Sequence, residues 1–80
     1  MKLSALIVDD EPLALDLLER YVVRTPFLEL KGKCASAGEA LQVLSAGGID
    51  VAFLDIQMPG MNGLELSRLT GDGTKVIFTT

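Results

Sequence analysis

The chain has 80 residues, a formal net charge of -4, 49% hydrophobic and 22% charged residues, which indicates one small globular domain rather than a disordered segment. Its acidic balance and scattered basic residues argue against direct nucleic-acid binding, and no apolar run approaches the roughly 20 residues of a membrane span. With no histidine and one cysteine, the chain excludes histidine-based catalysis, histidine zinc sites and an internal disulfide, and fits a reducing cytoplasm.

The first third of the chain predicts a strand followed by a helix. Residues 3–8 form a short apolar run that ends at two aspartates, as expected of a buried strand. Pro12 suits the first turn of a helix over residues 13–24, and Pro26 ends that helix. Within it, apolar residues recur at helical spacing: Ala14, Leu17, Leu18, Tyr21 and Val22.

The middle third predicts an edge strand and a second helix. From Leu28 to Cys34 apolar or small residues alternate with charged ones, which is typical of a strand with one polar face. Ser36 and Glu39 have the spacing of a capping box, so a helix should begin here and run to about Ala46. The glycine pair that follows closes the helix.

The last third predicts a strand over residues 51–55, a helix over 63–70 and a strand over 75–79. Asn62 and Glu65 have the spacing of a helix N-cap and its third residue, and a Gly-Asp-Gly turn precedes the final strand. The order is thus strand, helix, strand, helix, strand, helix, strand. Unbroken apolar strands in this order indicate an α/β fold, a parallel sheet with helices on both faces and right-handed crossovers.

In a doubly wound sheet of flavodoxin-like order 2-1-3-4-5, functional residues lie beyond the carboxyl ends of the strands. Asp9, Asp10, Asp55 and Thr80 all stand at such ends. Taken singly, the first two could be charges at a helix start, Asp55 a strand cap and Thr80 a chain end. Together, three converging carboxylates repel one another unless a cation lies between them. Mg²⁺ prefers such oxygen ligands, so the pattern favours metal-assisted phosphoryl transfer with a carboxylate nucleophile.

Three segments, "IVDDEP", "FLDIQMPGMNGLEL" and "VIFTT", resemble the receiver domain of bacterial two-component response regulators over the whole chain. "DDEPLAL" together with "IFTT" is most similar to the LytTR-type regulators, in which a receiver precedes a DNA-binding domain. The resemblance implies that a sensor histidine kinase donates a phosphoryl group from its phosphohistidine. It also implies that phosphorylation switches a downstream output, and that the chain itself is a phosphoacceptor rather than an enzyme.

The resemblance assigns roles to individual residues. Asp55 becomes the phosphoacceptor, Asp10 a direct Mg²⁺ ligand and Asp9 a partner that acts largely through water. Gln57 would give its backbone carbonyl to the metal, and Thr80, rather than Thr79, would be the switch hydroxyl. Two further residues, Pro59 and Gly63, would shape the loop after the phosphoacceptor.

The chain departs from the receiver pattern at its end, where a fourth helix, a fifth strand with its lysine, and a fifth helix are expected. Residues 1–80 therefore correspond to a partial receiver domain without a second domain. In the absence of the lysine, phosphorylation should be slow. The fourth strand should be an open apolar edge, through which we expect the chain to self-associate.

Three other functions are compatible with parts of the pattern. A pseudo-receiver would fold or oligomerise without phosphorylation. A haloacid-dehalogenase-type phosphatase also carries an aspartate after a parallel strand, but it needs a second aspartate two residues on, where this chain has Gln57. A flavin-binding module needs a hydroxyl-rich or amide-rich phosphate loop after the first strand, whereas "DDEP" would repel a phosphate.

Overall fold

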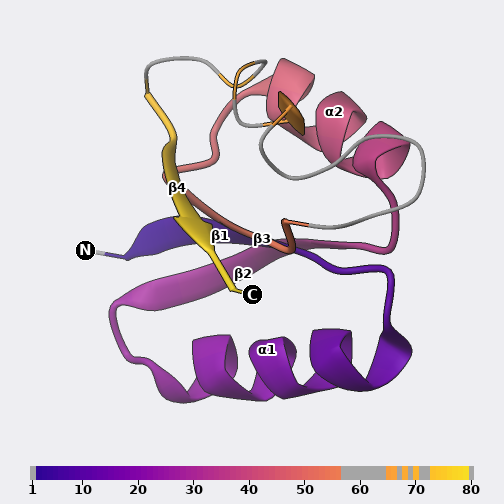
Figure 1. Ribbon diagram of the computed structural model, residues 1–80. Coiled ribbons are helices and arrows are strands. Elements are labelled where there is room, and N and C mark those ends of the chain that lie inside the picture. Colours follow the sequence, from indigo (N-terminus) through magenta and orange to yellow (C-terminus); the bar gives the residue numbers. More distant parts are fainter. Residues whose placement is uncertain (1, 57–64, 67, 69, 71–72, 80) are drawn as a thin grey trace.

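The computed structural model describes residues 2–56, 65, 66, 68, 70 and 73–79. Four parallel strands form one sheet: β1 (Leu3–Val8), β2 (Leu28–Cys34), β3 (Val51–Leu54) and β4 (Lys75–Phe78). Their order across the sheet is β2-β1-β3-β4 (Figure 1). The predicted flavodoxin-like order is therefore confirmed for these four strands, and β1 and β3 lie side by side in its centre.

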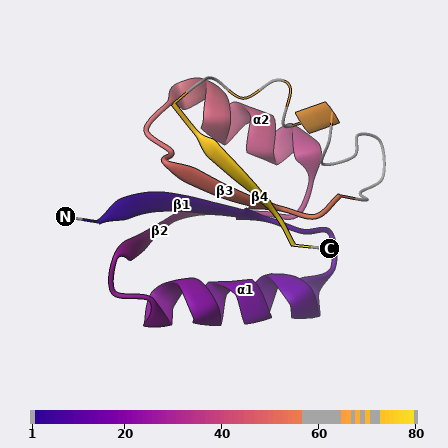
Figure 2. The same ribbon diagram turned by 60° about the vertical axis from the view of Figure 1, so that its left-hand side comes forward.

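One described helix lies on each side of the sheet. Figures 1 and 2 show α1 (Pro12–Arg24) on one face and α2 (Ala37–Ala46) on the other. The buried side chains accordingly form two clusters, one on the α1 side around Ile7 and one on the α2 side around Leu6. None of the described helices combines the length and the apolar composition that a membrane span needs.

Local sequence signals account for the limits of α2. The backbone N–H of Glu39 donates to Ser36 Oγ at 3.2 Å, and the carboxylate of Glu39 accepts from the Ala35 N–H at 3.2 Å. The first bond satisfies a backbone donor that the first helical turn leaves without a partner, and the second holds the residue before the N-cap Ser36 against the helix. At the other end Gly47 has φ 81°, in the region that favours glycine. The predicted start and end of this helix are confirmed.

The apolar stripe of α1 is wider than the side of the helix that is buried. Leu15 and Val22 are buried and Leu18 packs against them, whereas Leu17 is 49% and Tyr21 57% exposed. Positions 15, 18 and 22 lie on one side of a helix, and a helix that lies on a sheet buries only that side. The apolar periodicity thus predicts the helix correctly, but Leu17 and Tyr21 lie outside its buried side.

Two predicted strands are one residue shorter than expected. The strands β3 and β4 end at Leu54 and Phe78, so Asp55 and Thr79 directly follow them. Of the predicted helix over 63–70, residues 65, 66 and 68 are helical and Leu66 is fully buried in the α2-side cluster. The rest of that helix, including its predicted start, lies outside the described residues apart from Thr70.

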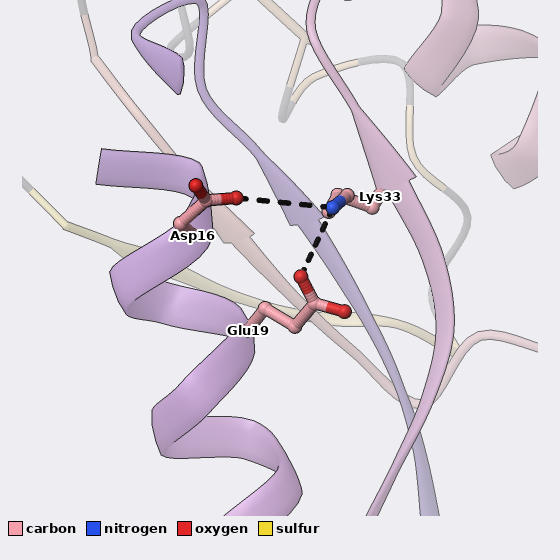
Figure 3. Close-up of polar contacts among 3 residues, drawn as sticks. All are labelled: Asp16, Glu19 and Lys33. Atoms are coloured by element: carbon pink, nitrogen blue, oxygen red, sulfur yellow. Dashed lines mark hydrogen bonds and ion pairs between the residues drawn. The ribbon is translucent and has the colours of Figure 1, made fainter. Parts of the chain in front are cut away.

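A surface ion pair joins α1 to the edge strand β2. Lys33 Nζ donates to Glu19 Oε1 at 3.0 Å and lies 3.9 Å from Asp16 Oδ1 (Figure 3). The hydrogen bond to Glu19 raises the pKa of Lys33 above its ordinary value. Because these side chains are exposed, the contact orients α1 on the sheet without adding much stability.

Candidate functional site

Two neighbouring strands end at the same edge of the sheet, and each is followed by an aspartate. Val8, the last residue of β1, pairs with Leu54, the last residue of β3. The backbone continues this pairing by one step, because the Asp55 N–H donates to the Val8 carbonyl at 3.1 Å. On the other side of β1, the Asp9 N–H donates to the Cys34 carbonyl at 3.1 Å. The sheet thus holds the backbones of Asp9 and Asp55 side by side.

The turn after β1 fixes the side-chain carboxylate of Asp9. Asp9 Oδ1 accepts a hydrogen bond from the Glu11 N–H at 2.9 Å, a local side-chain turn that leads into the first residue of α1, Pro12. Asp9 is 6% exposed, whereas Asp10, between the two bonded residues, is exposed. The turn therefore gives one buried and one accessible carboxylate at the same strand end.

The structure brings together the three aspartates that the sequence singled out. One carboxylate oxygen from each of Asp9, Asp10 and Asp55 lies within 4.8 Å of the other two. Asp55 is 9% exposed, so the strand end holds it mostly inside the molecule. Two oxygens bound to one Mg²⁺ ion lie at most about 4.2 Å apart, twice the bond length. The cluster therefore has nearly the size of a shared oxygen site for such an ion.

The hydroxyl and the backbone N–H of Thr79 both form hydrogen bonds to the neighbouring strand. Its N–H and its Oγ1 both donate to the Leu54 carbonyl, at 2.9 Å and 3.3 Å. Thr79 thereby holds the end of β4 against the residue that precedes Asp55. The predicted switch hydroxyl of Thr80 and the predicted backbone ligand Gln57 lie outside the described residues, as do the loop residues Pro59 and Gly63. Their roles remain predictions.

Backbone groups that the sequence did not reveal support the site. The backbone carbonyls of Val8 and Cys34 hold the backbones of Asp55 and Asp9 in place. Because every residue type has a backbone carbonyl, only the position of these residues at a strand end signals that they support the site. Cys34 itself is a buried free cysteine at the end of the edge strand β2. Burial, and secondarily the nearby Glu39 carboxylate, raise the pKa of its thiol. A thiol of this kind is a poor nucleophile at neutral pH.

Comparison with known sequences identifies one matching family and a set of similar proteins. The sequence profile of the family "Response regulator receiver domain" matches residues 5–80. The transcriptional regulatory protein MalR of Bacillus subtilis is 44% identical over 64 residues, which are 80% of this chain and 27% of MalR. The chain thus spans about a quarter to a third of the length of the curated relatives it matches.

Solved structures show the same fold. The response regulator domain of Thermotoga maritima CheB superposes with a TM-score of 0.87 at 28% identity, over 98% of this chain and 60% of that one. The response regulator TrrA of Thermotoga maritima, crystallised with Mg²⁺ and beryllium fluoride, is 34% identical with a TM-score of 0.80, over 98% and 68% of the two chains. TrrA has also been crystallised in complex with the histidine kinase ThkA. In that comparison the sequence identity is 34% and the TM-score 0.78, over 98% of this chain and 67% of the other.

Proposed function

The chain belongs to the response regulator receiver domain family, and from this premise we propose that Asp55 accepts a phosphoryl group from a sensor histidine kinase. The observation that supports this most is the convergence of Asp9, Asp10 and Asp55 at the carboxyl ends of two adjacent strands. Isolated acidic residues are common on protein surfaces. Two of these three are buried, at the sheet edge where ligands of doubly wound folds bind.

The donor set fits a magnesium ion. All three groups are carboxylates, and their oxygens lie within 4.8 Å of one another, so a divalent cation would relieve their mutual repulsion. We assign Asp10 and Asp55 as direct ligands, with Asp9 acting largely through water and the backbone carbonyl of Gln57 completing the set. When bound, Mg²⁺ supplies charge neutralisation for an incoming phosphoryl group. The Asp9 oxygen that accepts from Glu11 is already engaged, which favours its less direct role.

The position of Asp55 suits nucleophilic attack. Its backbone is held by the Val8 carbonyl, and it follows a strand whose last residue, Leu54, is fully buried. A carboxylate held on a rigid element needs little reorganisation to align with the phosphorus atom. A carboxylate oxygen of Asp55 forms the new O–P bond as the P–N bond of the phosphohistidine breaks, and the imidazole of the kinase leaves. The histidine belongs to the donor, and this chain has none.

The kinase must contact the surface around Asp55, and the first two turns of α1 offer an apolar one. Leu13 is 78% and Leu17 49% exposed. Leu13 stands three residues after Asp10, so this surface adjoins the carboxylates. We therefore assign Leu13 and Leu17 to the kinase contact. Leu13→Asp should slow transfer from a kinase but not from acetyl phosphate, whereas Val23→Asp, at the far end of α1, should change neither rate.

We propose that this receiver has a transcriptional output. MalR is named a transcriptional regulatory protein and is much longer than the matched segment. We propose that a chain of this type controls a DNA-binding domain. Because "DDEPLAL" and "IFTT" resemble the receivers of LytTR-type regulators, we propose that this domain is of the LytTR type. Residues 1–80 then act as its partial receiver domain in the cytoplasm, a phosphoacceptor that does not turn over substrate. The Thr80 hydroxyl would turn toward the phosphoryl group and report its presence.

We also propose self-association through β4. This strand forms one edge of the described sheet, and its residues Ile77 and Phe78 are 47% and 38% exposed. An exposed apolar edge strand is a ready site for pairing with another strand. The phosphoacceptor role does not depend on this contact.

A phosphoryl mimic tests the phosphoacceptor proposal. Beryllium fluoride with Mg²⁺ should raise the melting temperature of the wild-type chain well beyond the effect of Mg²⁺ alone. The mimic must bond to the Asp55 carboxylate, so Asp55→Asn should remove the additional rise. Asp50→Asn, at the opposite end of β3, is the matched control and should keep it. An equal rise in Asp55→Asn would contradict the assignment, and no rise in the wild type would favour a pseudo-receiver.

A further inference from the structure

The peptide group between Leu54 and Asp55 is held from both sides of β3. Its N–H, which belongs to Asp55, donates to the Val8 carbonyl at the end of β1 at 3.1 Å. Its carbonyl, which belongs to Leu54, accepts from the Thr79 N–H just after β4 at 2.9 Å. Both bonds continue the regular pairing of β3 with its two neighbours. Every residue type except proline has a backbone N–H, so the second bond requires no particular side chain at position 79.

The side chain of Thr79 adds a third bond to the same peptide group. Thr79 Oγ1 donates to the Leu54 carbonyl at 3.3 Å, and a carbonyl oxygen has two lone pairs with which to accept both donors. Leu54 itself is fully buried, whereas Thr79 is exposed. The fold does not need a hydroxyl at an exposed strand end, because valine has the same branched shape and fits a strand equally well. The contact that distinguishes threonine at this position is thus the bond to the Leu54 carbonyl.

The orientation of this peptide group determines where the Asp55 carboxylate points. A peptide group is planar, so a rotation of the Leu54 carbonyl also moves the backbone nitrogen of Asp55 and changes the direction of its Cα–Cβ bond. The strand end holds this carboxylate mostly inside the molecule, with one oxygen within 4.8 Å of oxygens of Asp9 and Asp10. A slightly misplaced oxygen attacks more slowly, because the rate depends on its alignment with the phosphorus atom.

We infer that Thr79 is a positioning residue for phosphoryl transfer to Asp55. Its hydroxyl fixes the Leu54 carbonyl, and the peptide group then holds the Asp55 carboxylate in the orientation for attack. The inference rests on the proposed phosphoacceptor role and adds a residue that acts through the backbone next to the nucleophile. This role is distinct from that of Thr80, whose hydroxyl we propose as the switch.

Two substitutions at Thr79 separate the hydroxyl from the stability of the strand. Thr79→Val keeps the branched shape and removes the donor, whereas Thr79→Ser keeps the donor and has a lower preference for strands. Urea denaturation should therefore give the serine variant the lower stability of the two. The rate of phosphorylation by acetyl phosphate at saturating Mg²⁺, followed by intact-mass spectrometry, should have the opposite order. We expect a rate roughly threefold to tenfold lower in Thr79→Val, the factor that one hydrogen bond contributes, and a rate near that of the wild type in Thr79→Ser.

Thr74→Val is the matched control at the other end of the same two strands. Thr74 Oγ1 donates to the Ile49 carbonyl at 2.7 Å, so this substitution removes the same kind of bond between the segments that precede β4 and β3. It should lower the stability at least as much as Thr79→Val and leave the rate of phosphorylation unchanged. Because acetyl phosphate is a small donor, docking of a kinase affects none of these rates.

The outcomes distinguish this inference from the proposed function. A wild type that gains no phosphoryl group would overturn the phosphoacceptor role and the inference with it. A wild type that is phosphorylated at the same rate as Thr79→Val would overturn the inference alone. The inference would also be overturned if Thr79→Ser or Thr74→Val were as slow as Thr79→Val, because the rate would then follow the stability of the strands.

Discussion

Replacement of Asp10 by asparagine should change the thermal stability of the chain in opposite directions with and without magnesium. Asp10 is exposed and is not needed for the sheet, but its carboxylate lies within 4.8 Å of those of Asp9 and Asp55. Asn has nearly the same shape and no charge. The substitution therefore removes repulsion from the ion-free chain and removes a ligand from the magnesium-bound one.

The size of the first effect follows from the distances. Two like charges at 4.8 Å, the upper limit of the separations among these oxygens, repel by about 0.9 kcal/mol at the dielectric constant of water. Asp10 has two such neighbours, and screening with a Debye length of about 8 Å lowers the sum to roughly 1 kcal/mol at physiological salt. For a domain of this size that corresponds to an increase in melting temperature of about 4–8 °C without magnesium.

The second effect has the opposite sign. An ion that binds only the folded chain stabilises it by about 2.7 kcal/mol at a hundredfold excess over Kd, which corresponds to roughly 10–20 °C in melting temperature. Asp10→Asn should lose more than half of this rise, because a charged ligand becomes a neutral one. Differential scanning calorimetry with EDTA and then with a magnesium series measures both effects on the same protein.

A matched control separates the site from surface charge in general. Asp16→Asn also removes one exposed carboxylate near the start of α1, but Asp16 lies outside the cluster and its nearest cation, Lys33, is 3.9 Å away. Its magnesium response should equal that of the wild type. An undiminished magnesium response in Asp10→Asn would show that the ion binds elsewhere and would refute the reasoning.

Three further predictions concern the rest of the chain. Ser36→Ala removes the side-chain cap of α2 and should lower the free energy of unfolding by about 1 kcal/mol, measured by urea denaturation; an unchanged value would mean that the cap is replaced. Burial raises the pKa of Cys34, so alkylation by iodoacetamide at pH 8 should be slow in the folded chain and fast in urea, and equal rates by mass spectrometry would contradict the burial. The raised pKa of Lys33 means that its ion pair with Glu19 stabilises the fold below the unfolded pKa and is lost as pH rises through the folded one. Melting temperatures of wild type and Glu19→Gln should therefore differ slightly at neutral pH and converge at alkaline pH, once Lys33 has lost its proton; a difference that persists there would point to packing instead.

The sequence predicted the elements whose limits depend on local signals. The capping box at Ser36 and the glycine pair after α2 define that helix through hydrogen bonds made within a few residues. Apolar runs too short for helices indicated the strands, and their order in the sheet is the one expected of a flavodoxin-like fold. The exposed face of α1 was harder to predict, because Leu17 and Tyr21 continue the apolar periodicity beyond the side that meets the sheet. Periodicity alone does not show where one buried side ends.

The candidate site was predictable to the extent that it depends on topology. Parallel strands end at a common edge, so Asp9, Asp10 and Asp55 had to lie near one another once β1 and β3 were neighbours. The backbone carbonyls of Val8 and Cys34 that hold two of them could not be predicted, because a main-chain group carries no residue-type signal. The hydrogen bonds of Thr79 to Leu54 likewise depend on tertiary pairing.

Intact-mass spectrometry after incubation with acetyl phosphate and Mg²⁺ tests the phosphoacceptor role of Asp55 most directly. The wild-type chain should gain the mass of one phosphoryl group, slowly, and lose it in hydroxylamine, which cleaves acyl phosphates. Asp55→Asn should gain none, while Asp16→Asn should behave as the wild type. Equal uptake by Asp55→Asn, or a wild-type adduct that resists hydroxylamine, would contradict the assignment of Asp55 as the phosphoacceptor.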